Sequence, residues 1–184
     1  MNRIEKEVRI PQQVSVRMEG DVLIVSGPKG ENRRKFWHPH VKLDVKEDKV
    51  IVSSTSSRRK DKAVVGTWIA HIKNMIYGVL EGFEATLKIV YSHFPMNVKR
   101  EGDYIIITNF LGEKGTRKAR IVGNVEVSIS KEEIVIKGTD IEAVGQTAAN
   151  LEQVTKDKGG RDIRKFFDGI YISKKPKRSE EIWQ

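Results

Sequence analysis

Lysine and arginine residues of this chain are gathered into four short segments, and the chemistry they offer is the binding of phosphate. Segments 29–35, 58–62 and 112–120 each carry a net charge of +3, and segment 156–178 carries +6. The whole chain of 184 residues has a formal net charge of +9, so the rest of it sums to −6. Clustered cations raise the local positive potential and release counterions on contact with phosphates. The pattern favours a nucleic-acid partner over charge that only maintains solubility.

Glycines accompany three of these basic segments. Gly30-Glu31 and Gly112-Glu113 each precede a run of Lys and Arg, and Lys158-Gly159-Gly160-Arg161 places two glycines between cations. Glycine adopts unusual backbone angles and lets main-chain N–H groups approach a phosphate. Turn formation alone is the alternative role for Gly30 and Gly112, and the two roles are compatible. For segment 158–161 we expect a close approach to a nucleic-acid backbone.

The chain offers no set of residues for catalysis or for a metal ion. It contains no cysteine, which excludes disulfides, thiol catalysis and cysteine-ligated zinc. The serine run 53–57 has no nucleophile motif around it and precedes a predicted helix, where serine caps the helix. Neither glycine loop has the spacing of a nucleotide-binding loop. His38 and His40 flank a proline but lack further ligands nearby. We therefore predict no enzyme activity, no metal and no cofactor.

Apolar residues form no run long enough to cross a membrane, which takes about 18 residues. Residues 1–7 contain no hydrophobic stretch of the kind that secretory signals carry. We expect a cytoplasmic protein.

Two stretches of the chain repeat the same order of residues and predicted elements. Val16–Asp21 reappears as Val98–Asp103, and Val41–Val45 reappears as Val125–Ile129. A repeat at this spacing predicts a duplicated structural unit, extending over residues 14–81 and 96–157. The modest hydrophobic content of 38% and the charged content of 32% fit two thin cores better than a single large one.

The period of the apolar residues predicts the elements of each copy. Alternation and turn residues predict strands, and apolar residues at three- and four-residue spacing predict one helix per copy. In the first copy we expect strands at 14–18, 22–26, 41–45 and 50–53 and a helix over 60–80. In the second copy we expect strands at 86–93, 96–99, 104–108, 125–130 and 133–137, then a helix that Thr139 and Glu142 cap and Gly159-Gly160 end. The basic segments 29–35 and 112–120 are expected to be loops. The predicted fold class is α+β, with two tandem duplicated domains, each an antiparallel sheet packed with one main helix, plus a basic C-terminal tail.

The C-terminal part departs from the repeat. We expect its apolar residues to pack back onto the second domain, including Ile163, Phe166, Phe167 and Ile170. For Phe166 and Phe167, stacking on a base is the alternative to this core packing, and for Tyr171 the two remain equal alternatives. The expected domains are residues 1–82, residues 83–172 as the main RNA-binding domain, and a basic tail at 173–184 that is flexible without RNA.

Three motifs of the second copy and the tail carry a resemblance to a known family. They are Gly145-Gln-Thr-Ala-Ala-Asn150, Lys158-Gly-Gly-Arg-Asp-Ile-Arg164 and Phe167-Asp-Gly-Ile-Tyr171. With the duplication, they make the chain similar to the universal large-subunit ribosomal protein six family, in its archaeal and eukaryotic branch. The tail motif is the specific part, because the bacterial branch carries a Lys-Gly-Lys-Gly type of tail in its place.

The resemblance implies a non-enzymatic protein that binds large-subunit rRNA near the translation-factor-binding region, close to the sarcin–ricin loop and the stalk base. Neighbouring large-subunit proteins are implied partners, and translation factors would be nearby. The resemblance assigns most RNA contact to the second domain and its tail, whereas the charge pattern treats both domains alike. Together with Tyr171, the residues expected to contact RNA are Lys114, Arg117, Lys118, Arg120, Lys158, Gly159, Gly160, Arg161, Arg164, Lys165, Lys174, Lys175, Lys177 and Arg178. The alternative hypothesis is a free regulatory protein that binds nucleic acid outside the ribosome.

Overall fold

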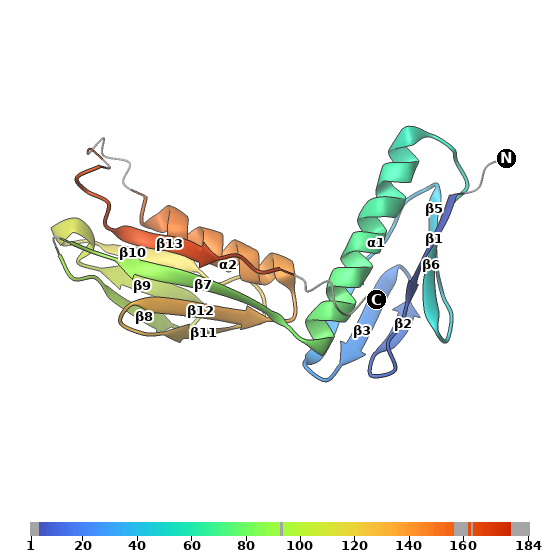
Figure 1. Cartoon of the computed structure of the whole chain (residues 1–184), viewed down its shortest axis with the longest axis horizontal. Coiled ribbons are helices and arrows are strands. Elements are labelled where there is room, and N and C mark those ends of the chain that lie inside the picture. The colour runs from blue at the N-terminus through green and yellow to red at the C-terminus, as the bar shows by residue number, and fades with distance from the viewer. Residues whose placement is uncertain (1–3, 93, 157–161, 163, 178–184) are drawn as a thin grey trace. The chain divides into compact units, whose positions relative to one another are not determined.

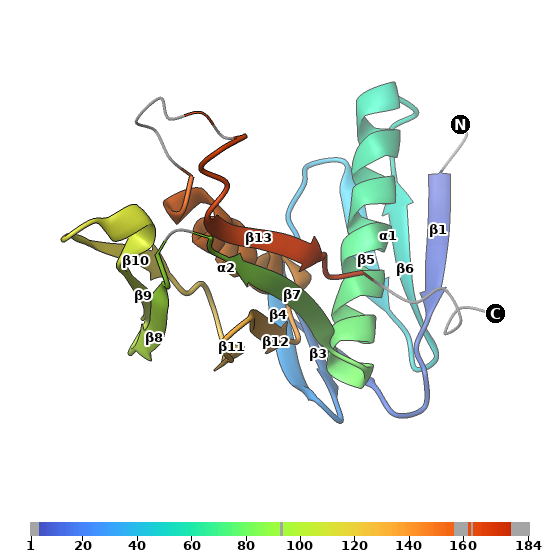
Figure 2. The ribbon, with the colours of Figure 1, turned by 60° about the vertical axis from the view of Figure 1, so that its left-hand side comes forward.

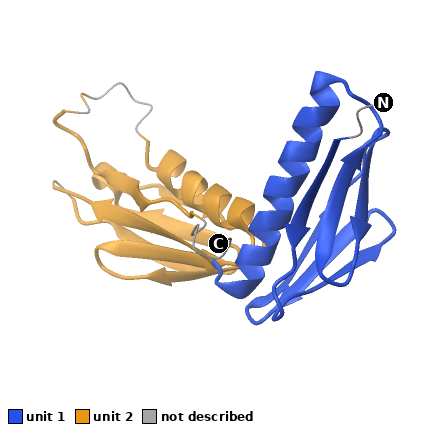
Figure 3. Cartoon of the chain, turned by 45° about the vertical axis from the view of Figure 1, so that its right-hand side comes forward, with its two compact units in different colours: residues 1–82, 178–184 blue, residues 83–177 orange. Residues whose placement is uncertain are grey.

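The computed structural model describes residues 4–92, 94–156, 162 and 164–177. The described chain forms two compact units, coloured separately in Figure 3. Described residues up to Gly82 belong to unit 1, and Phe83–Lys177 form unit 2. Each unit has its own sheets and one long helix (Figure 1).

Unit 1 consists of two three-stranded antiparallel sheets and one helix. One sheet has the order β1-β6-β5 and the other has the order β2-β3-β4. The elements are β1 (Ile4–Arg9), β2 (Ser15–Glu19), β3 (Val22–Gly27), β4 (Gly30–Lys35), β5 (Val41–Val45), β6 (Lys49–Ser54) and α1 (Arg59–Leu80).

The core of unit 1 lies between α1 and both sheets. Val65, Ile72 and Ile76 recur at helical spacing and are fully buried. The helix contacts strands of both sheets, which bury a continuous set of Val and Leu side chains against it. At its C-terminal end the approach is close, because a Cβ on Gly27 would lie 2.8 Å from Val79 Cγ2.

Unit 2 repeats this plan with one added strand. A four-stranded sheet has the order β11-β12-β7-β13 and a three-stranded sheet has the order β10-β9-β8, all antiparallel. The elements are β7 (Phe83–Val90), β8 (Asn97–Glu101), β9 (Tyr104–Thr108), the 3-10 turn η1 (Phe110–Gly112), β10 (Thr116–Arg120), β11 (Val125–Ile129), β12 (Glu133–Gly138), α2 (Ile141–Val154) and β13 (Gly169–Lys174).

Helix α2 covers this unit's core, lying along β7, β12 and β13 and also contacting β10 (Figure 2). Its buried face carries Val144, Ala148 and Leu151. The strands β2-β3-β4 and β5-β6 of unit 1 correspond to β8-β9-β10 and β11-β12 of unit 2. The predicted α+β fold with tandem duplicated domains is therefore confirmed.

Most of each basic segment that was expected to be a loop is a strand, so that prediction was wrong for residues 30–35 and 116–120, whereas residues 112–115 do form a turn. Segment 30–35 forms β4 and segment 116–120 forms β10. Each is the edge strand of its sheet, where one side of the backbone stays open to solvent and charged side chains are tolerated on both faces. Because most residues of β4 and β10 are charged, their sequences lack the alternation of apolar and polar residues that predicts a strand. The edge strands β1 and β13 were not expected either.

The start of α2 also differs from the prediction by one residue. The N-cap is Asp140, whose Oδ1 accepts a hydrogen bond of 2.9 Å from the N–H of Glu142. An acidic side chain serves this position as well as the expected threonine, since it accepts an N–H that the helix leaves without a partner. The helix ends at Val154, whereas Gly159-Gly160, its expected end, lies outside the described residues.

The C-terminal segment is divided differently from the expectation. Ile170 is fully buried, as predicted, but Phe166 and Phe167 are 37% and 46% exposed, so their expected core packing was wrong. Ile163 lies outside the described residues. Strand β13 continues through Ser173 and Lys174, two residues into the expected flexible tail. It does so because pairing with β7 supplies backbone hydrogen bonds, and Ser173 Oγ donates to Thr86 O over 3.0 Å.

Candidate nucleic-acid interface

Three segments of unit 2 gather at one end of it. They are the turn that leads into β10, the C-terminal end of α2, and the chain that enters β13, as Figures 1 and 2 both show. The turn itself is strained, because Asn109 and Leu111 adopt positive φ angles of 60° and 50°. Such conformations persist only where surrounding contacts hold them. Asn109 provides one such contact, donating from Nδ2 to Pro95 O over 2.9 Å.

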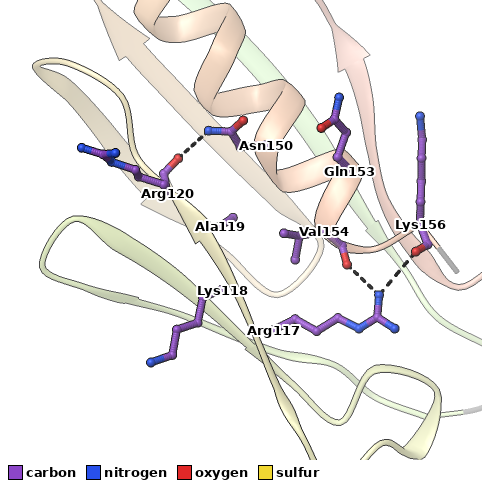
Figure 4. A pocket seen from close by; sticks show the side chains of 8 residues that line it. All are labelled: Arg117, Lys118, Ala119, Arg120, Asn150, Gln153, Val154 and Lys156. Carbon is purple, nitrogen blue, oxygen red and sulfur yellow. Dashed lines mark hydrogen bonds between the residues drawn. The ribbon is translucent and has the colours of Figure 1, made fainter. Parts of the chain in front are cut away.

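Arg117 joins the turn to the end of α2. Its Nε and Nη2 donate to the two carboxylate oxygens of Glu113 at 2.9 and 2.7 Å. Its Nη1 donates to Val154 O at 2.7 Å, with a weaker contact to Lys156 O at 3.4 Å (Figure 4). The guanidinium also lies 4.3 Å from the centre of the Phe110 ring, within cation–π range. Only 24% of the Arg117 side chain is exposed. The structure thus shows an internal role for Arg117, and its expected contact with RNA stays a prediction.

Lys118 and Arg120 have the opposite orientation. In β10, Arg117 and Ala119 face inward, so the residues between and after them project outward. Figure 4 shows both cations extending away from the Arg117 guanidinium. Neither side chain has an ion-pair partner within the described part of the chain, and both are exposed. These two cations are therefore available to a phosphate backbone.

An open cavity of about 600 Å³ lies between β10 and α2. Its lining combines cations with neutral amides: Arg117, Lys118, Ala119, Arg120, Asn150, Gln153, Val154 and Lys156 (Figure 4). Asn150 connects the two elements, since its Nδ2 donates to Arg120 O over 2.9 Å. Gln146 Nε2 in turn donates to Asn150 Oδ1 over 2.9 Å, which orients the amide. The cavity offers hydrogen-bonding groups and positive charge on one surface.

The motif at 167–171 is a folding motif. Asp168 is buried and accepts a hydrogen bond of 3.0 Å from Ser92 Oγ. The N–H of Ile170 donates to Thr155 Oγ1 over 2.9 Å, and Thr155 is itself buried at the end of α2. These contacts tie the entry of β13 to β7 and α2 and so set where the preceding chain emerges. The sequence reasoning missed Ser92 and Thr155, because nothing in their local pattern marks them.

Tyr171 is not packed in the core, and its stacking on a base stays a prediction. It is 43% exposed, and its hydroxyl donates to Phe167 O over 2.7 Å. A Cβ on Gly169 would lie 3.2 Å from the Tyr171 ring, so glycine is needed for the ring to fold back over the chain. The side chain thereby closes the turn that carries the exposed Phe167.

We expect Tyr171 to ionise above the ordinary tyrosine pKa of about 10. Partial burial raises the pKa of Tyr171, and the negative charges of Asp168 and Glu152 raise it further. Because the folded state holds this proton more tightly than the unfolded state, stability should fall as pH rises past about 10. A phenolate absorbance titration of the wild type minus that of Tyr171→Phe measures the effect. A difference curve centred at or below pH 10 would contradict it.

The other described residues that were expected to contact RNA differ in position and in whether they are paired. Lys114 is exposed just after the strained turn, and Lys165 is exposed in the segment that leads into β13. Arg164 is exposed but paired, since its Nε and Nη2 contact both oxygens of Asp162 at 3.0 Å. This pairing lowers the pKa of the Asp162 carboxyl and raises the pKa of Arg164.

The basic residues at the C-terminal end of β13 and just after it do not lie at the end of unit 2 that carries the candidate interface. Gly169 pairs with Val90 and Lys174 pairs with Thr86, so the strand carries the chain away from the interface. The exposed Lys174, Lys175 and Lys177 therefore follow at the far end of β13. The remaining expected contacts lie outside the described residues: Lys158, Gly159, Gly160, Arg161 and Arg178.

Other kinds of site find little support in the described residues. No group of three or more potential metal-binding side chains occurs among them. His38 and His40 lie with ring centres 6.1 Å apart. None of the described helices is long and apolar enough to cross a membrane.

Comparison with known proteins gives a consistent result along the chain. The family model described as ribosomal protein L6 matches residues 10–82 and again 94–166, one match per repeat. The chain is 51% identical to the large ribosomal subunit protein uL6 of Methanosarcina mazei, over 95% of this chain and 99% of that protein. It is 51% identical to the protein of the same name from Archaeoglobus fulgidus, over 94% and 90% of the two chains. For Haloarcula marismortui the identity is 43%, over 98% and 99%. The chain belongs to the ribosomal protein L6 family, in the branch of its archaeal members.

Proposed function

We propose that this chain is a structural component of the large ribosomal subunit and binds large-subunit rRNA through the end of unit 2. The family and the names of the archaeal relatives support the ribosomal role. The observation that carries the rRNA interface is the pair of outward cations Lys118 and Arg120, which have no ion-pair partner among the described residues, beside an open polar cavity. The resemblance supports a location near the sarcin–ricin loop and the stalk base, in the translation-factor-binding region.

The mechanism of binding follows from the kinds of groups at this end. Lys and Arg side chains neutralise phosphates, and the two glycines between the cations of segment 158–161 permit close approach of the RNA backbone. The exposed rings of Phe166 and Phe167 offer surfaces on which an unpaired base stacks. Recognition in this arrangement depends on the shape and the backbone of the RNA more than on its sequence.

Membership in the family also supports three further parts of this function. The chain acts without catalysis, as a structural protein, and works on the ribosome in the cytoplasm. Neighbouring large-subunit proteins are its other partners, and translation factors pass close to its site. The binding residues expected in unit 2 hold RNA helices in a fixed arrangement.

We expect Arg161→Ala/Arg164→Ala to reduce incorporation into large subunits without unfolding unit 2, because the side chain of Arg164 is exposed and takes no part in the buried core. The measurement is sedimentation of a cell lysate through sucrose at moderately high salt, with detection of the tagged variant. Arg17→Ala/Arg33→Ala removes the same charge from unit 1 and is the control. If the double variant is incorporated as well as wild type, the assignment of Arg161 and Arg164 as RNA contacts is wrong. Wild-type protein that stays at the top of the gradient would reject the ribosomal role and favour the free nucleic-acid-binding alternative.

A further inference from the structure

Trp37 of unit 1 is unusually open to solvent. It is 68% exposed, the largest fraction of any exposed large hydrophobic residue in the described chain. Its neighbour Phe36 is buried and packs edge-to-face on Trp68 with ring centres 5.2 Å apart. The chain therefore anchors itself in the core at one residue and presents the next to solvent.

The loop that carries Trp37 is fixed on both sides. His38 Nε2 lies 3.9 Å from Oδ1 of Asp61, which is buried in the first turn of α1. The N–H of His40 contacts His38 Nδ1 at 3.3 Å, and Thr55 donates its N–H to His40 O at 3.0 Å. These contacts hold the loop against the start of α1. Because the loop backbone next to Trp37 is held in this way, less conformational freedom is left to lose when a ligand binds there.

Asp61, which lies next to His38 of this loop, stands within a dense group of cations. Arg58, Arg59, Lys60 and Lys62 surround Asp61 in sequence, and all four are exposed. None of the four side chains has an ion-pair partner within the described residues. By contrast, Arg17 and Arg33 on the neighbouring sheet both contact Glu31, which offsets their charge. The segment 58–62 thus keeps a net charge of +3, with no ion-pair partner for its four cations among the described residues.

We propose that Trp37 and the cations at 58–62 form a second RNA-binding site, which takes an unpaired nucleotide of a single-stranded segment. The base stacks on the indole, and the adjoining phosphates contact Arg58, Arg59, Lys60 and Lys62. An aromatic ring with cations beside it is the composition of sites that bind single-stranded nucleic acid, because every base has a face that stacks. Four cations favour a polyanion over an apolar protein surface as the occupant. This site goes beyond the proposed function, whose interface lies in unit 2.

The test measures binding of the full chain to a fluorescently labelled single-stranded oligoadenylate at low salt. Trp37→Ala is expected to weaken binding about tenfold, the effect of losing one stacked base. Trp37→Phe keeps an aromatic face and should retain most of the affinity. Arg58→Ala/Arg59→Ala should weaken binding and lower the dependence of affinity on salt, whereas Arg17→Ala/Arg33→Ala, the charge-matched control, should change both less.

Two features of the design keep the result interpretable. Trp37 is mostly exposed, so Trp37→Ala should unfold at the wild-type temperature, which a thermal melt checks. The series is repeated with Lys118→Glu/Arg120→Glu present, so that failure of the unit 2 interface is measured separately. Equal affinities of Trp37→Ala and wild type in both backgrounds would overturn the proposal. Photo-crosslinks from position 37 to protein alone in purified large subunits would also overturn it, and crosslinks to rRNA would support it.

Discussion

Arg117→Ala is expected to lower the free energy of unfolding by about 3 kcal/mol. The guanidinium makes a two-pronged, partly buried ion pair with Glu113 and a hydrogen bond to Val154 O. Charged hydrogen bonds of this kind contribute about 1.5–3 kcal/mol, and the cation–π contact with Phe110 adds about 0.5–1 kcal/mol. The loss should also loosen the strained turn at 109–112, which Arg117 holds to the end of α2. Urea unfolding followed by circular dichroism measures the change.

Two comparison variants make this prediction specific. Arg117→Lys keeps the charge but cannot donate to both Glu113 oxygens and to Val154 O in the same geometry, so we expect an intermediate loss. Lys118→Ala removes the adjacent exposed cation and should change the free energy of unfolding by less than about 0.5 kcal/mol. If Arg117→Ala were as stable as Lys118→Ala, the internal role assigned to Arg117 would be wrong.

Lys118→Glu/Arg120→Glu is expected to weaken binding of large-subunit rRNA about 100-fold, with little change in stability. Both side chains project from β10 into solvent without ion-pair partners in the described chain, so their charge is available to phosphates. Two lost charge-assisted contacts of about 1.4 kcal/mol each correspond to that factor. The alanine pair Lys118→Ala/Arg120→Ala should lower the slope of log affinity against log salt by about 2. Filter binding at several salt concentrations measures both quantities.

Lys99→Glu/Arg100→Glu provides the matched control for this pair. It makes the same change of charge on β8, the opposite edge strand of the same sheet. An electrostatic attraction spread over the whole unit would make the two double variants equally weak. If the interface is local, Lys118→Glu/Arg120→Glu should lose much more affinity for rRNA than Lys99→Glu/Arg100→Glu. Equal losses of affinity would refute a local interface.

Much of the fold was predictable because it is encoded locally. Alternation at 41–45 and helical spacing along α1 reflect which side chains are buried, so the pattern predicts the element directly. The strands that escaped prediction are all edge strands. In β4 and β10 the charged residues obscure the alternation, and β1 and β13 depend on pairing with strands that are far away in the sequence.

For the candidate interface, the sequence shows how much positive charge is present, whereas only the structure shows where that charge points. The number and clustering of cations at 112–120 could be read from the sequence, since net charge needs no structure. Which of those cations face outward could not, because that depends on the register of β10 and on where α2 ends. Arg117, Arg164 and Lys118 look alike in the sequence, yet the first two are engaged with Glu113 and Asp162. Composition cannot distinguish a paired cation from an available one.

The sequence by itself determined the duplication, the α+β class, the basic character of segments 29–35, 58–62 and 112–120, and the family. Each depends on the order of residues over short spans. Only the tertiary structure decided that Phe166 and Phe167 are exposed and that the loop of Trp37 reaches Asp61, which the cations at 58–62 surround in sequence. The contact between His38 and Asp61 brings residues together that are well separated in the chain. Such contacts arise from the packing of strands and helix, which no local pattern of residue types encodes.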